Sequence, residues 1–352
     1  MMKPLRTSPQ SGFAVLLVMV VITALSILAG ALAIFMKVES QLAQNTNDSE
    51  DLYWAGRGGV ERACWILAME PPGVTSLKQK WAGGPGDGPE TNGPLINITL
   101  KGYPVGHAIV DLSMEEQESK FNINTADTPL LNQVLTTMGA DASDISVVSD
   151  SIQDWIDPDD ATRPAGAESD YYQGLMPSYY AKNAPIDNIE ELQLIKGITP
   201  EMFKGGGGDP NSPFKHHHLG FGRAPGQAAE YPFGLRDVFT PYSNGKVNLN
   251  TADVNVLSCI PNLDTNVAEA IKQLRNSEGG AMAGSGVLHD FNQLREVLPN
   301  PALIQQIQRY CTFGGNTYKV TATARIGSNS QEFIAIIMRN GLRTQIVSFH
   351  PK

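Results

Sequence analysis

An uninterrupted apolar run from Phe13 to Met36 constrains this chain more than any other feature of its sequence. The 24 residues of the run include no charged side chain, and only Thr23 and Ser26 carry hydroxyl groups. Because a helix rises about 1.5 Å per residue, the run can cross the hydrocarbon core of a bilayer, which is roughly 30 Å thick. Two cations without an acidic neighbour, Lys3 and Arg6, precede it and predict a cytoplasmic N-terminus. We therefore expect a single-pass membrane protein with its bulk on the far side.

The residues before the run distinguish between two kinds of N-terminal signal. A secretory signal has an apolar region of about 7 to 15 residues, followed by a cleavage site with small residues. Here the apolar run is longer, and the small residue, Gly12, precedes it. A charged leader, a glycine, a phenylalanine and a full membrane helix are the arrangement of type IV prepilins, which residues 1–40 resemble. The resemblance implies that a prepilin peptidase cuts between Gly12 and Phe13 and that Phe13 is N-methylated. An unprocessed signal anchor is the alternative.

The fifth residue of the expected mature chain, Leu17, departs from the common prepilin pattern. Most pilins and pseudopilins carry a glutamate there, which neutralises the terminal amine of a neighbouring subunit inside the membrane. A carboxylate in hydrocarbon is costly, so it is retained where a partner needs it. A subunit at the tip has no neighbour above it whose terminal amine must be neutralised. A subunit with leucine at this position is therefore expected to cap the tip. Within the prepilin class, this feature resembles the minor pseudopilin K family of the type II secretion system.

Charge bears on the kind of partner. The 352 residues carry a formal net charge of −10, and removal of Lys3 and Arg6 with the leader would make it −12. An acidic surface disfavours binding to nucleic-acid phosphates, so no nucleic acid is expected as a partner.

The cysteines give no metal signature. Cys64, Cys259 and Cys311 lack the spacing of metal ligands. Cys259 and Cys311 either form a disulfide in an oxidising compartment or remain buried thiols.

Runs of β-forming residues occur on both sides of a long middle segment. An Asn340-Gly341 pair between two of these runs is a strong hairpin signal. Two strands before residue 120 and three after residue 315 are too few apiece for a stable sheet but are sufficient together, so the segment between them is an insertion. The predicted strands are Leu95 to Leu100, Gly106 to Leu112, Thr317 to Ile326, Gln331 to Arg339 and Leu342 to Phe349.

The insertion, residues 121–312, contains an internal repeat. Phe121-Asn-Ile-Asn-Thr-Ala-Asp127 recurs as Val247-Asn-Leu-Asn-Thr-Ala-Asp253, and a helical pattern follows each copy. Thr125 and Thr251 suit helix N-caps. Two related helical modules, about 121–204 and 246–312, are therefore expected, and they resemble SAM-like or helix-hairpin-helix domains. The Gly- and Pro-rich residues between them, 205–245, are expected to form a mobile loop.

These patterns predict an α+β fold. Its long N-terminal membrane-spanning helix continues towards Ala68, with a bend or fray at its glycines, and packs on a small antiparallel sheet, as in pilins. A large, mostly helical insertion of the two modules interrupts that sheet. The expected parts are the leader 1–12, the membrane helix 13–36, a pilin-like α/β domain of 37–120 and 313–352, and the insertion 121–312.

An acidic stretch in the first module is a candidate metal site. Asp157, Asp159, Glu168 and Asp170 stand on either side of a glycine-containing turn, and carboxylate oxygens are the ligands that Ca²⁺ prefers. The alternative is a solvated acidic turn, with Asp154 and Asp157 acting as helix caps. The resemblance to the pseudopilin K family, whose insertion carries a similar pair of motifs, implies Ca²⁺.

No enzymatic activity is expected. His216 to His218 lack a positioned carboxylate, and the glycine-rich run from Gly83 to Gly88 lacks the lysine and the helix of a phosphate-binding loop.

The resemblance as a whole implies a minor pseudopilin at the tip of a periplasmic pseudopilus, anchored in the bacterial inner membrane. Its implied partners are other minor pseudopilins, contacted through the N-terminal helix, the prepilin peptidase, and the secretin or secreted cargo. Its implied task is to initiate pseudopilus assembly and so support secretion across the outer membrane. Two alternatives remain: a minor pilin of a type IV pilus or competence system, and a membrane-anchored periplasmic binding module.

Overall fold

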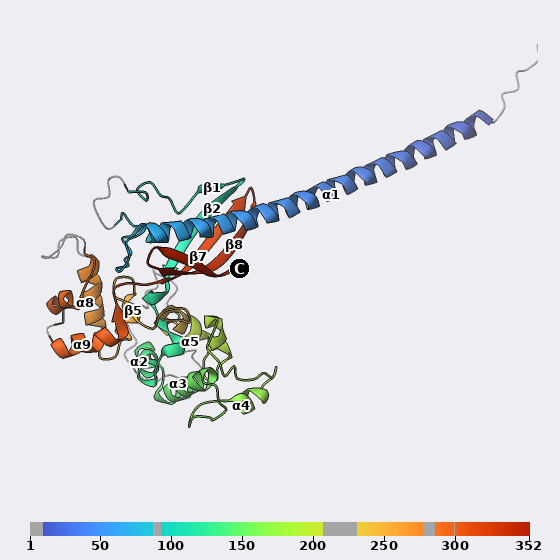
Figure 1. Ribbon diagram of the computed structural model, residues 1–352. Helices are drawn as coiled ribbons and strands as arrows, with labels where there is room; N and C mark the ends of the chain where they lie inside the picture. Colours follow the sequence, from blue (N-terminus) through green and yellow to red (C-terminus); the bar gives the residue numbers. More distant parts are fainter. Residues whose placement is uncertain (1–9, 87–92, 207–230, 277–285, 299) are drawn as a thin grey trace, which may run out of the picture.

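The computed structural model describes residues 10–86, 93–206, 231–276, 286–298 and 300–352. A long helix, α1 (Gln10–Met69), packs on a five-stranded antiparallel sheet, and a group of short helices lies beyond that sheet (Figure 1). The predicted α+β fold is therefore confirmed. Most of the predicted leader and most of the predicted mobile loop, with His216 to His218, lie outside the described residues.

Helix α1 runs unbroken through the glycines that were expected to bend or fray it. A Cβ atom on Gly56 would lie 2.2 Å from Cδ2 of Phe333, and one on Gly59 would lie 2.9 Å from Cγ1 of Val110. These glycines allow the sheet to approach the helix closely, and this packing outweighs their low helix propensity. The expectation of a fray at these positions was wrong.

The sheet has the order β1-β2-β7-β8-β9, and all its neighbours are antiparallel. Strands β2 and β7 are adjacent, with Glu116 opposite Tyr318. The chain therefore leaves the sheet after β2 and returns to it as β7, the strand next to β2. The strands are β1 (Tyr103–Val105), β2 (Ala108–Glu116), β7 (Thr317–Ile326), β8 (Asn329–Asn340) and β9 (Arg343–Pro351).

The predicted strand from Leu95 to Leu100 was wrong. These residues form turns, in which the Ile98 amide donates to the Leu95 carbonyl at 3.1 Å. Leu95 is buried against the helix and sheet, whereas Ile96 is exposed. A turn that buries one apolar side chain can show the same short alternation of apolar and polar residues as a strand. The pattern therefore did not distinguish a turn from a strand.

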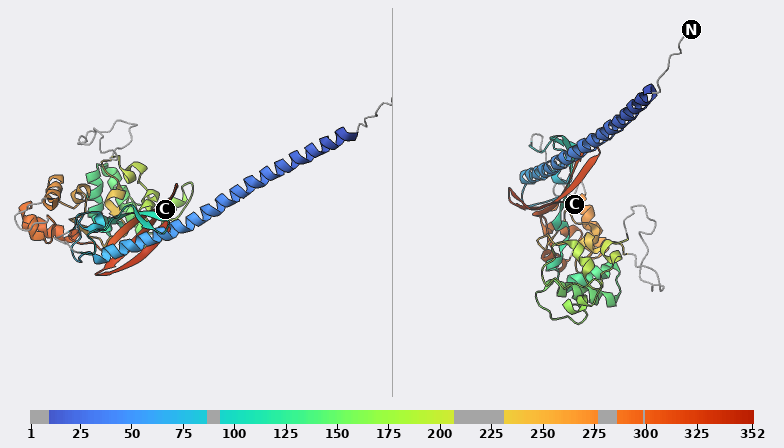
Figure 2. Two further views of the ribbon diagram at one scale, coloured as in Figure 1. Left: turned by 90° about the horizontal axis from the view of Figure 1, so that it is seen from above. Right: turned by 90° about the vertical axis from the view of Figure 1, so that its right-hand side faces the viewer.

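One hydrophobic cluster lies between α1 and the sheet. Side chains of α1, among them Val60 and Ile66, are fully buried against β2, β7 and β8. The α1 residues from Phe13 to Met36 make no such contacts and project away from the body, as both views in Figure 2 show. Packing therefore fixes only the C-terminal half of α1.

A second hydrophobic cluster fills the inserted segment and runs from Phe121 to Phe313. Its longer helices form two groups, α2 with α3 and α8 with α9 (Figure 1). The elements are β3 (Phe121–Asn122), η3 (Ile123–Thr125), α2 (Thr128–Met138), α3 (Ala142–Ile156), α4 (Ser169–Gln173), η4 (Ile189–Leu194), α5 (Pro200–Lys204), α6 (Leu235–Val238), β4 (Phe239–Thr240), β5 (Val247–Asn248), α7 (Val254–Ser258), α8 (Thr265–Asn276), η5 (Phe291–Glu296), α9 (Pro301–Tyr310) and β6 (Cys311–Thr312).

The repeated sequence motif has a repeated structure. Strand β3 pairs in parallel with β4, and β5 pairs in parallel with β6. The expected caps differ, because Asp127 and Asp253 are the N-cap residues of α2 and α7. Thr251 instead donates its hydroxyl hydrogen bond to the buried carboxylate of Glu116. Thr125 donates to the carbonyl of Asn122 at 3.4 Å, so the threonine caps were wrong.

The cysteines are buried and free. Cys64 lies in the helix–sheet cluster, and Cys259 and Cys311 lie in the cluster of the insertion. Burial raises the pKa of all three thiols, which keeps them protonated and unreactive. Of the two alternatives for Cys259 and Cys311, the structure has the buried thiols.

Candidate functional site

The N-terminal part of α1 is apolar and exposed over its whole length. Within the described part of the chain, α1 is the one helix that is long and apolar enough to cross a membrane. The hydroxyl of Thr23 donates to the carbonyl of Met19 at 3.0 Å, and that of Ser26 donates to the carbonyl of Ile22 at 2.8 Å. Both polar groups are thus satisfied within the helix, as a membrane requires.

The residues of the predicted processing site lie at the start of α1. Phe13 and Leu17 are exposed on this helix, and Gly12 belongs to its first turn. Leu17 therefore lies on the open surface of the N-terminal helix. Cleavage after Gly12 stays a prediction.

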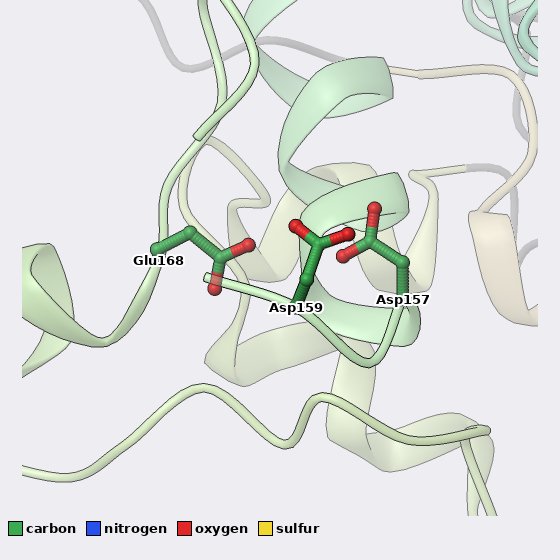
Figure 3. A group of neighbouring side chains, drawn as sticks. All are labelled: Asp157, Asp159 and Glu168. Atoms are coloured by element: carbon green, nitrogen blue, oxygen red, sulfur yellow. The ribbon is translucent and has the colours of Figure 1, made fainter. Parts of the chain in front are cut away.

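Three of the four predicted metal ligands meet at the end of α3. Oxygen atoms of Asp157, Asp159 and Glu168 all lie within 4.8 Å of one another, and Figure 3 shows their carboxylates turned towards a common space. Asp157 follows the last residue of α3, and Glu168 precedes the first residue of α4. Asp170 is exposed on α4 and is not part of this acidic cluster.

Local sequence explains how the loop between α3 and α4 closes. Pro158 cannot continue the helix, so the chain turns after Asp157. The Asp159 carboxylate accepts from the Ala161 amide at 2.9 Å and holds the turn. A Cβ on Gly166 would lie 2.0 Å from Oδ2 of Asp154, so only glycine allows the returning chain to pass there. Glu168 reaches the end of α3 for this reason.

Among the described residues, the carboxylate of Glu168 has no hydrogen-bond partner. The residue is 4% exposed, and neither of its oxygens accepts a hydrogen bond. Oδ1 of Asp157 is also buried and without a partner. Burial, followed by the charges of Asp154 and Asp157, raises the pKa of Glu168 to about 7. Buried oxygens without a donor are costly unless something satisfies them, and a cation would do so.

The residues present fit a divalent cation with a preference for hard oxygen ligands. Asp157, Asp159 and Glu168 offer three carboxylates, and Ca²⁺ takes 6–8 oxygen ligands, including water and backbone carbonyls. The short distances between their oxygens and the two partnerless groups of Asp157 and Glu168 favour a metal centre over a solvated acidic turn.

Sequence reasoning missed Arg163, the cation that balances this cluster. Arg163 places Nη1 at 2.7 Å from Oδ1 of Asp154 and at 2.5 Å from Oδ2 of Asp157. Asp154 is fully buried. The signal was present in the sequence, because Arg163 is the only cation between Asp154 and Glu168.

A second acidic pair, also missed, lies where the sheet meets the insertion. Glu116 and Glu118 are both buried. Glu116 accepts from the Asn248 amide group at 2.8 Å and borders a cavity of about 320 Å³. Burial raises the pKa of Glu116 to about 8, although hydrogen bonds from Thr251 and Asn248 oppose the shift. The amides of Asn316 and Thr317 donate to Glu118. These contacts tie β2, β5 and β7 together.

Comparisons with known proteins show which family the chain resembles. A family model described as "Type II secretion system (T2SS), protein K" matches residues 109–205. The type II secretion system protein K of Klebsiella pneumoniae is 23% identical over 211 residues, which are 55% of this chain and 60% of that protein. That of Aeromonas hydrophila is 22% identical over 216 residues, 55% of this chain and 61% of that protein. The matches span about three fifths of these relatives' lengths.

A shorter sequence match and a solved structure point to the same family. The putative type II secretion system protein K of Escherichia coli K12 is 30% identical over 108 residues, 27% of this chain and 33% of that protein. A chain of the GspK-GspI-GspJ complex from the type 2 secretion system of enterotoxigenic Escherichia coli has the same fold, with a TM-score of 0.61 at 14% identity over 88% of this chain and 99% of that chain. This chain is therefore similar to the type II secretion system protein K family, a non-enzymatic family of minor pseudopilins, in the sequence of residues 109–205 and in its fold.

Proposed function

We propose that this protein caps the tip of a type II secretion pseudopilus and initiates its assembly. The observation that carries the proposal is the position of the inserted segment. The inserted segment lies near the C-terminal end of α1, far from the apolar residues of that helix (Figures 1 and 2). In a filament, another subunit would otherwise stack at this end. Leu17 supports the same position, because a tip subunit has no neighbouring amine to neutralise.

In this proposal each part of the chain has one task. A prepilin peptidase removes residues 1–12, and Phe13 is then N-methylated. Residues 13–36 span the inner membrane and pack on sibling helices. Residues 37–120 and 313–352 form the pilin-like body, and residues 121–312 form the periplasmic cap, which faces the secretin or the cargo.

The proposed partners are sibling minor pseudopilins. The similar Escherichia coli structure is described as a complex of GspK with GspI and GspJ. By that likeness we assign to this protein the corresponding I and J subunits of its own system. The unpacked apolar half of α1 supports the assignment, because Phe13 and Leu17 are exposed on the helix surface.

The acidic cluster is proposed to hold Ca²⁺ through Asp157, Asp159 and Glu168. A bound cation would tie the end of α3 to the start of α4 and neutralise carboxylates that otherwise repel one another. Its role here is structural, since it lies within the proposed cap. Asp170 is left out of the proposed ligand set because its side chain is exposed outside the cluster.

Assembly from a defined set of subunits tests the proposal. The major pseudopilin is overproduced in cells that contain or lack this protein, with the I and J subunits present in both. We expect filaments, and stoichiometric recovery of the three minor subunits from detergent extracts, only when this protein is present. Normal filaments in its absence would contradict the initiating role. An uncleaved Gly12→Val chain is the control for correct membrane insertion without entry into the filament.

A further inference from the structure

The end of α3 carries two cation-binding arrangements that share one residue. Oδ2 of Asp157 bonds to Nη1 of Arg163 at 2.5 Å. Oδ1 of the same carboxylate is buried and has no hydrogen-bond partner among the described residues, and one oxygen of Asp157 lies within 4.8 Å of oxygens of Asp159 and Glu168. Asp157 therefore belongs both to an ion pair within the chain and to the proposed metal centre.

Arg163 is built into this position. Its backbone amide donates to both carboxylate oxygens of Asp154, at 3.3 and 3.2 Å, and its guanidinium bonds to the same group at 2.7 Å. Asp154 is fully buried, whereas the Arg163 side chain is 35% exposed. A buried carboxylate needs such a partner, because leaving it unpaired is strongly destabilising. The guanidinium thus supplies positive charge at the cluster without any bound ion.

The same charge opposes a metal ion. A unit charge about 6 Å from a divalent ion, even with water-like screening, costs about 1.4 kcal/mol, which is roughly a factor of ten in affinity. Lys196 approaches the loop differently, because its Nζ donates to the carbonyls of Gly166 at 2.8 Å and Ala165 at 3.3 Å. None of the hydrogen bonds or ion pairs found for Lys196 in the described residues involves a carboxylate of the cluster.

We propose that Arg163 is a built-in competitor of the metal ion. Its guanidinium neutralises Asp154 and Asp157 while no divalent ion is bound, and it lowers the affinity of the centre for Ca²⁺ by about tenfold. This inference rests on the proposed Ca²⁺ centre. Through Arg163 the insertion keeps its loop closed at low calcium and responds only when calcium is abundant.

Calorimetric titration of the full-length chain with CaCl₂, in detergent and at low ionic strength, tests this. Arg163→Gln should bind Ca²⁺ about tenfold more tightly than the wild type, because the opposing charge is gone. Arg163→Lys keeps the charge and should stay within about threefold of the wild type. Lys196→Gln is the matched control, because it removes a cation that contacts the same loop, and it should also stay within about threefold.

Melting curves provide a second readout. With a chelator, Arg163→Gln should melt at a lower temperature than the wild type, because the buried carboxylate of Asp154 loses its guanidinium partner. Saturating Ca²⁺ should restore it, so its calcium-induced shift should exceed that of the wild type.

Each outcome of the two measurements has a fixed meaning. Equal or weaker Ca²⁺ binding by Arg163→Gln, or a chain that stays unfolded in saturating Ca²⁺, overturns the competitor role while the Ca²⁺ centre of the wild type stands. Ca²⁺ binding by Arg163→Gln but not by the wild type supports the competitor role, because Arg163 would then prevent binding rather than weaken it. Absence of binding in both chains overturns the Ca²⁺ centre and the competitor role together.

Discussion

Asn124 and Ile186 exchange a reciprocal pair of hydrogen bonds. The Asn124 side-chain amide donates to the Ile186 carbonyl at 2.9 Å, and the Ile186 amide donates back to Asn124 Oδ1 at 2.7 Å. Asn250 and Leu288 repeat the arrangement, at 2.8 and 2.9 Å. In each half of the insertion, an asparagine of the repeated motif thus clamps a segment that follows dozens of residues later.

The clamp predicts a graded loss of stability. Asn250→Asp removes the donor to the Leu288 carbonyl and places a charge in a buried site, so we expect a loss of about 2 to 4 kcal/mol. Asn124→Asp should cost less, because Asn124 is only half-buried. Urea denaturation measures both, with the exposed Asn292→Asp as the control. Losses for Asn250→Asp no larger than those of the control would show that the clamp contributes nothing.

Processing at Gly12 predicts the start of the mature chain. In a host that expresses the prepilin peptidase, the purified protein should begin with N-methyl-Phe13. Gly12→Val should block maturation, because the peptidase must accept a residue with almost no side chain. Intact mass spectrometry of membrane-extracted protein distinguishes the two forms. Wild-type chains that retain the leader would instead favour a simple signal anchor.

Leu17 predicts the position of the subunit in the filament. At the tip, Leu17→Glu should give no gain in assembly and should lose some, because the new carboxylate has no partner in the membrane. In an interior subunit the same change should help. Filament counts by electron microscopy decide between the positions, with Leu16→Glu, one residue along the exposed helix, as the control. Better assembly with Leu17→Glu would contradict the capping position.

The metal centre predicts a calcium-dependent melting temperature. Binding adds RT ln(1 + [L]/Kd) to stability, about 2.7 kcal/mol at one hundred times Kd. Ca²⁺ should therefore raise the melting temperature relative to chelator, and Asp157→Ala should abolish the difference. Asp170→Ala, an exposed carboxylate outside the cluster, should leave it intact. A wild-type chain indifferent to Ca²⁺ across the millimolar range would reduce the cluster to an acidic turn.

Glu116 predicts a pH dependence of opposite sign to that of a typical salt-bridged carboxylate. Its folded pKa, about 8, lies above the ordinary value of 4.5. The folded state therefore holds the proton more tightly. The stabilisation is complete below about pH 4.5 and is lost as the pH rises to about 8, by roughly 1.4 kcal/mol per unit of pKa difference.

Denaturation between pH 5 and pH 8.5 measures this loss. Glu116→Gln, which stays neutral, should flatten the pH dependence relative to the wild type. The exposed Glu115→Gln is the neighbouring control. Parallel pH profiles for the wild type and Glu116→Gln would show that Glu116 is ionised in the folded protein throughout this range.

Much of the architecture was predictable because it depends on local periodicity. The apolar run after Gly12, the Asn340-Gly341 turn and the long strands near the C-terminus are patterns that the structure repeats almost residue by residue. The run from Leu95 to Leu100 failed because so short an alternation does not distinguish a strand from a turn.

The polar contacts were predictable only in part. Asp157, Asp159 and Glu168 stood out by composition, but Arg163, the partner of Asp157, is defined by the way in which the loop folds back. Glu116 could not be identified as buried, since its environment comes from residues more than a hundred positions away, such as Asn248. Burial by residues that are distant in the sequence cannot be detected from the local pattern of residue types.

The return of the chain to the sheet also has a consequence for folding. Strand β7 pairs with β2, although contacts such as that between Thr317 and Glu118 join residues 199 positions apart. Closing a loop of this length has an entropic cost that delays the pairing. As the chain is synthesised, β2 stays unpaired on that side until the insertion has followed. An insertion that folds first brings its own ends together and so shortens the time before β7 pairs with β2. During that time the unpaired edge of β2 is open to mispairing.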